Sequence, residues 1–294
     1  MDNQEERGWK GQSRGGRIGN AIFVCTIKLF GVKCAYFLLS LVVIYFIPFA
    51  PKATAAIWSY NRKRLGYGIL RSIKELYMHY FVFGQTLIDK VALKSGLQDR
   101  FNFAFDNYER FLEIINGDTG VVMIGAHVGS WEAGSVFFGD YGKKINVVMF
   151  DVERQEIREV LEQESRRAGY KIIPVNEGSI EALLKIKIAL NEGEYVCFNG
   201  DRHVDKATAT EKEFMGAKAH FPVGPFRIAA KCRVPVVFYY SVREKGGTYR
   251  FMFTEVQDFN RDYDKLLDTY VKSLEDTVRR YPRQWFNFYQ FWND

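Results

Sequence analysis

The chain has 294 residues, of which 41 are basic and 35 acidic, and its formal net charge is +6. Hydrophobic residues make up 47% and charged residues 26%, which argues against disorder or fibrous repeats and indicates one large globular domain or two small ones. Four cysteines without a CxxC pair argue against thioredoxin-like redox sites and structural zinc motifs, so we expect free thiols in a reducing compartment.

The N-terminal part is expected to attach the chain to a membrane. Residues 1–20 are polar, Gly-rich and basic and predict a flexible tail, whereas residues 21–52 form a predicted membrane-associating segment. Its uncharged part, Cys34–Ala50, would reach only about 26 Å as a helix, against roughly 30 Å for a hydrocarbon core. Basic residues flank both ends, which leaves open whether the segment spans the bilayer or lies in its interface. A buried core helix is the alternative.

Residues 53–294 are predicted to form one α/β domain with a helical N-terminal part. Apolar residues recur three and four positions apart over residues 53–97, which predicts helix. His79 lies in that stretch, and we expect it to pack like an aromatic ring rather than bind a ligand. Phe101–Asn116 is predicted as a further amphipathic helix.

From Thr119 onward, short apolar runs alternate with helical patterns. The predicted strands are Gly120–Ala126, Ile145–Phe150, Lys171–Val175, Tyr195–Asn199, Val234–Val242 and Tyr249–Glu255. The predicted helices are Glu132–Phe138, Arg154–Ala168, Ile180–Asn191, Phe226–Lys231 and Asp262–Tyr281. This alternation predicts an α/β fold, with a central, mostly parallel sheet covered by helices and an N-terminal helical, membrane-associating extension.

The segment GVVMIGAHVGSWEAG, which begins at Gly120, carries the strongest chemical signal. His127 follows an apolar strand, at the edge of the sheet where α/β folds bind ligands. A tight loop with Ser130 as a helix N-cap could bring Glu132 back to the imidazole of His127. A carboxylate on one ring nitrogen fixes the tautomer and leaves the other nitrogen to act as a base. Since this dyad contains no nucleophile, a substrate hydroxyl or amine would have to supply one.

Other catalytic readings of the sequence are weaker. There is no G-x-S-x-G motif, which disfavours that class of serine hydrolase. Cys197 with His203 could form a nucleophile pair, but Cys197 is predicted to lie buried in a strand. A zinc site is a further possibility, because His and Asp side chains can bind zinc, but the spacing of the candidate residues matches no local metal-binding pattern. The candidate ligands are His127, Asp201, His203 and His220.

Four ordered segments resemble one known family. GAHVGSWEAG resembles the H-x4-[DE] motif of the glycerolipid and lysophospholipid acyltransferase superfamily, and more closely that of the bacterial lipid A late acyltransferases. GEYVCFNGDR at 193–202 is similar to a family strand that ends in an Asp-containing loop. EFMGAKAHFPVGPFRIAAKCRVPVV at 213–237 and the aromatic YPRQWFNFYQFW at 281–292 resemble two later family segments. The resemblance covers nearly the whole chain.

The resemblance implies an acyltransferase with catalytic residues His127 and Glu132, where His127 takes the proton of an acceptor hydroxyl and Glu132 orients it. It also implies substrate-binding roles for further residues. These are Arg154, Asp201, Arg202, Phe214 and Gly216.

Several of these roles have alternatives. Asp201 is as well explained as a loop cap, and Arg202 is better explained as a structural or phosphate-contacting residue than as an oxyanion donor. Arg154 stands where the family often has a Tyr-Arg pair. Backbone amides near the start of the helix at Ser130 are candidates for stabilising the oxyanion, and Arg154 or Arg202 is the alternative. The aromatic residues between Trp285 and Trp292 have three alternative roles: they line an acyl site, contact lipid headgroups or pack against the sheet.

The implied donor is an acyl thioester carried by acyl carrier protein or coenzyme A. The implied acceptor is a hydroxyl of a membrane lipid, and a lipid A precursor is the first choice. An acylated amino-acid lipid, a lysophospholipid and an inactive lipid-binding scaffold are the alternatives. No cofactor and no metal is implied, and no recognition element for nucleic acid is found. The positive charge suits an anionic membrane surface and an acidic carrier protein. The implied location is the cytoplasmic face of the bacterial inner membrane.

Overall fold

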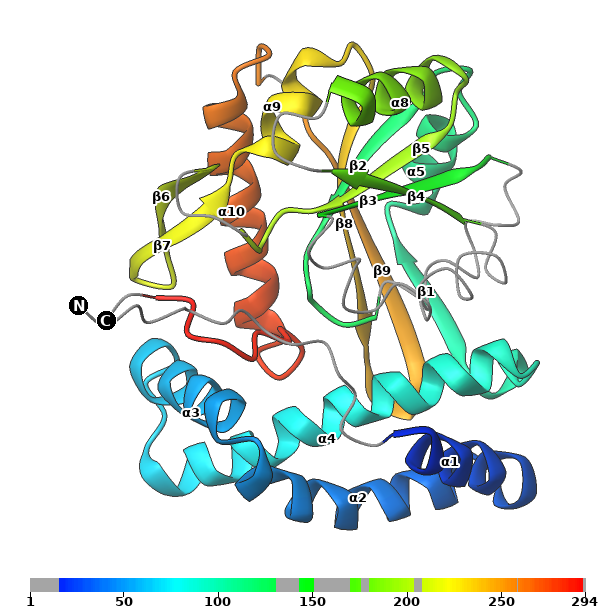
Figure 1. The fold of residues 1–294 in the computed structure, drawn as a ribbon, viewed down its shortest axis with the longest axis vertical. Helices are drawn as coiled ribbons and strands as arrows, with labels where there is room; N and C mark the ends of the chain where they lie inside the picture. Colours follow the sequence, from blue (N-terminus) through cyan, green and yellow to red (C-terminus); the bar gives the residue numbers. More distant parts are fainter. Residues whose placement is uncertain are drawn as a thin grey trace.

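The computed structural model describes residues 16–130, 143–150, 170–175, 180–203, 208–257 and 259–292. The N-terminal part is helical, as expected: α1 (Gly16–Phe30), α2 (Val32–Phe49), α3 (Pro51–Ser59), a π-helical turn (Tyr60–Arg64) and α4 (Ile69–Lys94). Figure 1 shows α1, α2 and α4 as a layer beneath the lower ends of the strands. The helical pattern over 53–97 is interrupted before α4, where Gly66 has a φ of 65°.

The main sheet has seven strands in the order β1-β9-β8-β2-β5-β3-β4. Every pair is parallel except β8–β9, which confirms the expected mostly parallel α/β fold. The strands are β1 (Asn102–Asp106), β2 (Val121–Gly125), β3 (Ile145–Phe150), β4 (Tyr170–Val175), β5 (Tyr195–Asn199), β8 (Val236–Arg243) and β9 (Thr248–Glu255).

Helices cover both faces of this sheet. On β2, Val122 and Ile124 belong to one apolar cluster, whereas Val121 and Met123 belong to the other. The first cluster includes side chains of α8 (Ile180–Asn191), α9 (Gly224–Lys231) and α10 (Tyr263–Arg280). The second includes side chains of α1, α2, α4 and α5 (Tyr108–Ile115). Burial on both faces explains why the central strands are continuous apolar runs.

One local prediction is wrong. Residues 101–116 do not form one helix: after a short 3-10 turn at Gln98–Arg100 they form β1 and α5, which are joined at Asn107 in a left-handed conformation. The alternating Phe103 and Phe105 stack on Phe251 of β9, so edge pairing overrides the helical spacing.

The hairpin of β6 (Ala209–Phe214) and β7 (Ala217–Pro222) was not predicted from the sequence. β6 carries three consecutive charged residues, Glu211–Glu213, and of its six residues only Phe214 is buried. A further 3-10 turn, Lys245–Gly247, joins β8 to β9. The helices predicted over Glu132–Phe138 and Arg154–Ala168 lie outside the described residues.

His79 in α4 is buried between Tyr60, Phe286 and Phe288, as the packing interpretation expects. Burial lowers the pKa of the His79 imidazole from 6.5 to about 4, despite the opposing charge of Glu75. The unfolded chain therefore takes up this proton first as the pH falls, and folding stability is lost between about pH 6.5 and pH 4.

We expect His79 to reduce the free energy of unfolding by about 2 kcal/mol between pH 7 and pH 5. Urea unfolding at both pH values, on the wild type and on His79→Phe, measures this contribution. The variant keeps a ring of similar shape and cannot titrate. If it retained the full pH dependence of the wild type, another group would be responsible.

Candidate active site

His127 and Asp201 follow two adjacent parallel strands at the same edge of the sheet. In the β2–β5 register Gly125 lies opposite Asn199, so each of the two functional residues stands two positions beyond its strand. Gly200 donates its amide to the Gly125 carbonyl at 2.9 Å and continues this alignment past the strand ends. Equal overhangs on neighbouring parallel strands therefore bring the imidazole and the carboxylate together.

The Asp201 carboxylate holds His127 by two contacts. One oxygen, Oδ1, lies 2.8 Å from His127 Nδ1, and the other, Oδ2, accepts the His127 backbone N–H at 3.0 Å. Because an ionised carboxylate only accepts, the Nδ1 atom carries the proton and Nε2 is left as the basic nitrogen. The His127 side chain is 27% exposed and Asp201 only 2%, so the base is open to a substrate while its partner is not.

Asp201 is itself fixed by the indole of Trp285, whose Nε1 donates to Oδ2 at 3.2 Å. Burial alone would raise the pKa of the Asp201 carboxyl. The charge of His127, its hydrogen bonds and the charge of Arg202 outweigh burial and lower this pKa to about 2. The carboxylate is therefore ionised at any physiological pH and can stabilise an imidazolium beside it.

The C-terminal segment pairs with the loop that carries His127. Phe286 donates its amide to the His127 carbonyl at 2.8 Å, and Gly129 donates to the Gln284 carbonyl at the same distance. Val128 and Trp285 form an antiparallel bridge between these contacts. The backbone of the catalytic loop is thus held by a segment that lies 157 positions further along the chain, as counted from Val128 to Trp285.

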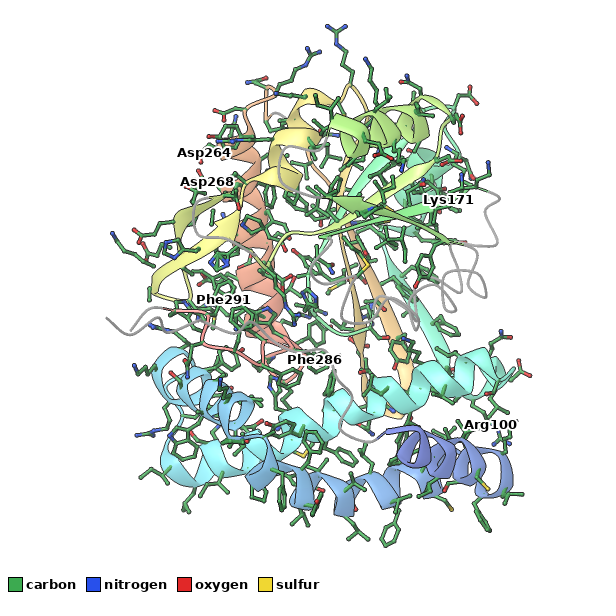
Figure 2. The ribbon with its side chains drawn as sticks, in the orientation of Figure 1. Arg100, Lys171, Asp264, Asp268, Phe286 and Phe291 are labelled. Carbon is green, nitrogen blue, oxygen red and sulfur yellow. The ribbon has the colours of Figure 1, made fainter. Side chains whose placement is uncertain are left out.

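The indole of Trp285 is in turn surrounded by aromatic rings. These rings belong to Tyr60, Phe214, Phe291 and Trp292. Figure 2 shows Phe286 between the C-terminal segment and α4, with Phe291 farther along that segment. Most of the closing aromatic residues are buried, so the packing interpretation holds for Trp285, Phe286, Phe291 and Trp292.

The turn after His127 requires glycine. Gly129 has a φ of 68°, and a Cβ there would overlap the Ser241 carbonyl oxygen. The next amide, of Ser130, donates to that same oxygen at 2.8 Å. The Ser130 amide is thus already bonded to β8, as the Gly129 amide is to Gln284. The amides that follow Ser130 lie outside the described residues, so an oxyanion role for backbone amides near the start of that helix stays a prediction.

Glu132 and Arg154 lie outside the described residues, so the structure does not place either one. Asp201 contacts Nδ1 of His127. A contact of Glu132 with a ring nitrogen of His127 stays a prediction. Arg202 donates from Nη2 to the Phe286 carbonyl at 3.1 Å, and its guanidinium lies 5.9 Å from the Tyr289 ring centre. These contacts fit the structural interpretation of Arg202.

Phe214 and Gly216 lie in the β6–β7 hairpin. Phe214 is fully buried against Trp285, so it supports the residue that holds Asp201. Its carbonyl accepts from the Trp292 indole at 3.1 Å. Gly216 has a φ of 77° in the hairpin turn, a conformation that favours glycine. Their substrate-binding roles remain predictions.

The alternative sites are a Cys197 nucleophile and a zinc site. Cys197 is buried in β5, and burial raises the pKa of its thiol to about 12, so it is not a thiolate nucleophile at neutral pH. His203 and His220 stack with ring centres 5.9 Å apart. In the part of the chain that the structure describes, no cluster of three His, Cys, Asp or Glu side chains is placed to hold a metal ion.

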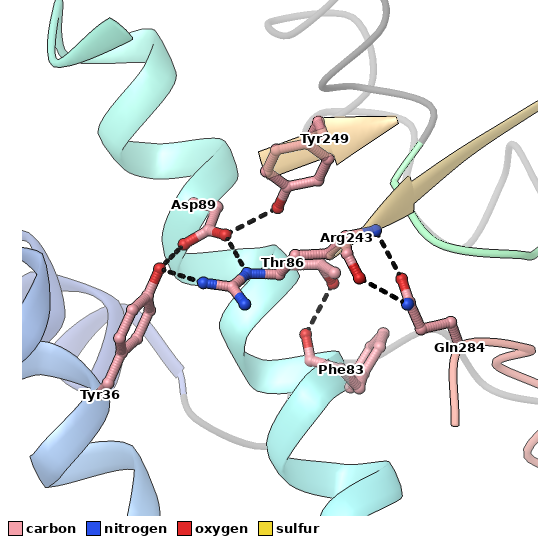
Figure 3. A network of polar contacts seen from close by, with 7 residues as sticks. All are labelled: Tyr36, Phe83, Thr86, Asp89, Arg243, Tyr249 and Gln284. Carbon is pink, nitrogen blue, oxygen red and sulfur yellow. Dashed lines mark hydrogen bonds and ion pairs between the residues drawn. The ribbon is translucent and has the colours of Figure 1, made fainter. Parts of the chain in front are cut away.

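Sequence reasoning missed the close pairing of Asp201 with His127. The available signal was positional: His127 directly follows the predicted strand Gly120–Ala126, and Asp201 follows the predicted strand Tyr195–Asn199 by two positions. That these two strands are neighbours was not predicted. It also missed a buried polar network that joins the helical layer to β8 (Figure 3). Asp89 of α4 accepts from Arg243 Nε and from the Tyr249 hydroxyl, each at 2.7 Å, and also from the Tyr36 hydroxyl of α2.

This network reaches the catalytic loop through Gln284. The Gln284 side chain accepts from the Arg243 amide and donates to the Arg243 carbonyl, both at 2.7 Å. Its backbone carbonyl binds Gly129, as described above.

Comparison with known proteins bears on the family of the chain. A search of curated proteins finds no match. The family model described as bacterial lipid A biosynthesis acyltransferase matches residues 74–294. This range contains most of α4, the whole main sheet, His127, Asp201 and the C-terminal segment. With three quarters of its length matched and an acid–base pair at the carboxyl edge of the sheet, the chain belongs to the bacterial lipid A biosynthesis acyltransferase family.

Proposed function

We propose that this acyltransferase moves an acyl chain from a thioester to a hydroxyl of a membrane lipid, with a lipid A precursor as the first choice of acceptor. The observation that carries the proposal is the His127–Asp201 pair. Asp201 occupies Nδ1, so Nε2 of a partly exposed imidazole is the available base. The donor is acyl carrier protein or coenzyme A, and the site is supplied from the cytoplasmic face of the inner membrane.

In the proposed reaction, Nε2 removes the proton of the acceptor hydroxyl as its oxygen attacks the thioester carbonyl carbon. A C–O bond forms and a tetrahedral oxyanion results. When it collapses, the C–S bond breaks and the imidazolium returns the proton to the leaving thiolate. The products are the ester and the free thiol. The base contributes about 10² to 10⁴ in rate, and holding both substrates in place contributes more.

The position of the pair beside the helical layer supports a lipid acceptor. Phe286, whose amide binds the His127 carbonyl, contacts two rings of α4. Its ring centre lies 4.9 Å from that of Phe83 and 5.9 Å from that of His79. A single layer of aromatic side chains thus lies between α4 and the backbone of His127. On its other side α4 packs against the apolar helix α2.

Lipid mass spectrometry tests this function. Cells that carry the wild type, a deletion or His127→Ala are extracted and compared. We expect both mutants to lose the same single acyl chain from one lipid class, because removing the base stops transfer. The mass of the remaining core identifies the acceptor and distinguishes a lipid A precursor from an acylated amino acid or a lysophospholipid. A lipid change in the deletion but not in His127→Ala would contradict the mechanism and favour a lipid-binding scaffold.

A further inference from the structure

The outer surface of α2 is apolar and exposed. Its large side chains there are between 54% and 71% exposed. They are Phe37, Leu41, Ile44, Tyr45 and Phe49. Their spacing of three and four places them along one helix face. The opposite face carries the buried residues Ala35, Leu39 and Val43.

This outer surface extends onto the neighbouring helices. Leu29 and Phe30 of α1 are each 69% exposed, and Leu70 at the start of α4 is 85% exposed. Because α1, α2 and α4 contact one another, these residues belong to one helical layer. We call the layer of α1, α2 and α4 the outer layer. Exposed apolar residues gathered in this way mark a surface that meets a membrane or another molecule.

By length and composition α2 could be taken for a membrane span, since its 18 residues are strongly apolar. Its packing argues otherwise. Leu39 presses against Gly84 of α4, and Tyr77 of α4 donates its hydroxyl to the Ser40 carbonyl at 3.2 Å. Tyr36 donates to Asp89. These contacts hold α2 lengthwise along α4.

If α2 crossed the bilayer in this arrangement, α4 would enter the hydrocarbon with it. α4 carries the exposed Arg71 and Lys74, and its buried Asp89 is bonded to Arg243 of the sheet. Each charge at the centre of a bilayer costs about 2.5–3.5 kcal/mol on insertion scales. Detaching α2 instead would remove Tyr36 from Asp89 and expose the side chains between the helices. The packed layer is compatible only with a position parallel to the membrane.

The charge of this region fits an anionic surface. Residues 16–74 contain nine Lys and Arg and no Asp or Glu. This excess is larger than the net charge of +6 for the whole chain, so the remaining residues are net acidic. Each basic side chain near an anionic bilayer contributes about 1 kcal/mol. Five of the nine belong to α1, α2 and α4, which carry the exposed apolar residues, and four belong to α3 and the π-helical turn that follows it. Apolar and basic residues occur together in this way in helices that lie in membrane interfaces.

We propose that the outer layer rests in the interface of an anionic lipid bilayer with α2 parallel to the membrane plane, so that the chain attaches to one leaflet and does not cross it. Both ends of the chain then lie on the same side of the membrane as the His127 site. The proposal does not depend on the reaction proposed above.

Protease access to both ends of the full chain is the first test. Epitopes are placed at the N- and C-termini, and sealed inverted inner-membrane vesicles and spheroplasts are digested. We expect both epitopes to be cleaved in inverted vesicles and both to be protected in spheroplasts. Cleavage of one epitope in each preparation would overturn the proposal, because α2 would then span the bilayer. Cleavage of both in spheroplasts only would support attachment to one leaflet but contradict the cytoplasmic location.

Flotation with vesicles is the second test, and it uses variants of exposed residues that leave the core intact. With vesicles of equal phosphatidylglycerol and phosphatidylethanolamine, Phe37→Asp/Leu41→Asp is expected to reduce binding at least about tenfold. The matched control is Leu183→Asp/Leu184→Asp on α8, at the other end of the molecule, where both residues are also exposed. Equal loss in both pairs, or no loss in the first, would overturn the proposal.

The charge contribution is separated by lipid composition. Lys28→Gln/Lys33→Gln/Lys52→Gln is expected to weaken binding to the mixed vesicles and to leave binding to pure phosphatidylethanolamine unchanged. A triple change on the other end, Lys185→Gln/Lys187→Gln/Lys231→Gln, controls for net charge. If the outer layer instead joined two copies of the chain, the Phe37 and Leu41 variants would shift the detergent-solubilised protein to a smaller species without changing flotation, and the proposal would fail.

Discussion

Replacing Asp201 by Asn is expected to lower kcat by about 10² to 10⁴ with little change in KM. The Asn amide would keep the size of the side chain but could donate toward His127 Nδ1. The imidazole proton would then move to Nε2, and the nitrogen that faces the substrate could no longer accept a proton. Single-turnover acyl transfer from a thioester, measured from pH 5 to pH 9, separates this loss from substrate binding.

Glu132→Gln is the informative comparison for this experiment, because the family resemblance assigns the orienting role to Glu132. If the Asp201–His127 contact is the one that matters, Asp201→Asn and His127→Ala each abolish most activity, and the double variant is no worse than either. Retention of kcat in Asp201→Asn together with its loss in Glu132→Gln would contradict the assignment. Glu132 would then be the residue that orients His127. Thermal melts of each variant exclude a loss caused by unfolding.

Replacing Asp89 by Ala is expected to lower the free energy of unfolding by about 3–5 kcal/mol. Asp89 is fully buried and accepts hydrogen bonds from three side chains (Figure 3), so its loss leaves the Arg243 guanidinium buried without its counter-ion. The penalty arises mainly from that unpaired charge. Urea unfolding in the detergent-solubilised full chain measures it, provided that the transition of the wild type is two-state.

Two further variants separate the charge from the rest of the network. Tyr36→Phe removes one hydroxyl donor and is expected to cost only about 0.5–1.5 kcal/mol. Asp89→Ala/Arg243→Met removes both charges and is expected to recover part of the loss seen in Asp89→Ala alone. A double variant less stable than Asp89→Ala would show that the network matters through packing rather than charge.

The central strands could be predicted from the sequence, to within two residues at each end, because they are buried on both faces. Ile145–Phe150 and Tyr195–Asn199 were predicted with the bounds that β3 and β5 have. The hairpin of β6 and β7 has one exposed side, and its mixed charged and apolar residues match no simple buried pattern. Likewise β1 is an edge strand whose pairing with β9 depends on residues more than 140 positions away.

The active site was predictable in part. His127 was identified from its place at the end of an apolar strand and from the motif that resembles the family. Its contact with Asp201 requires knowing that β2 and β5 are neighbours in register, although 70 residues of chain separate them. No local spacing contains that information, which is why Glu132, five positions away, was the nearer choice.

The sequence by itself determined the class of this protein: an α/β fold, a basic apolar N-terminus and a family motif are all local or compositional properties. Tertiary structure decided that Asp201 contacts His127, that the Ser130 amide is already bonded, and how α2 lies on α4. Each of these depends on long-range contacts, such as Trp285 with Asp201 and Tyr36 with Asp89. Such contacts form only when the sheet order and the helix packing are established, because a buried charge is stable only where distant segments supply its partners.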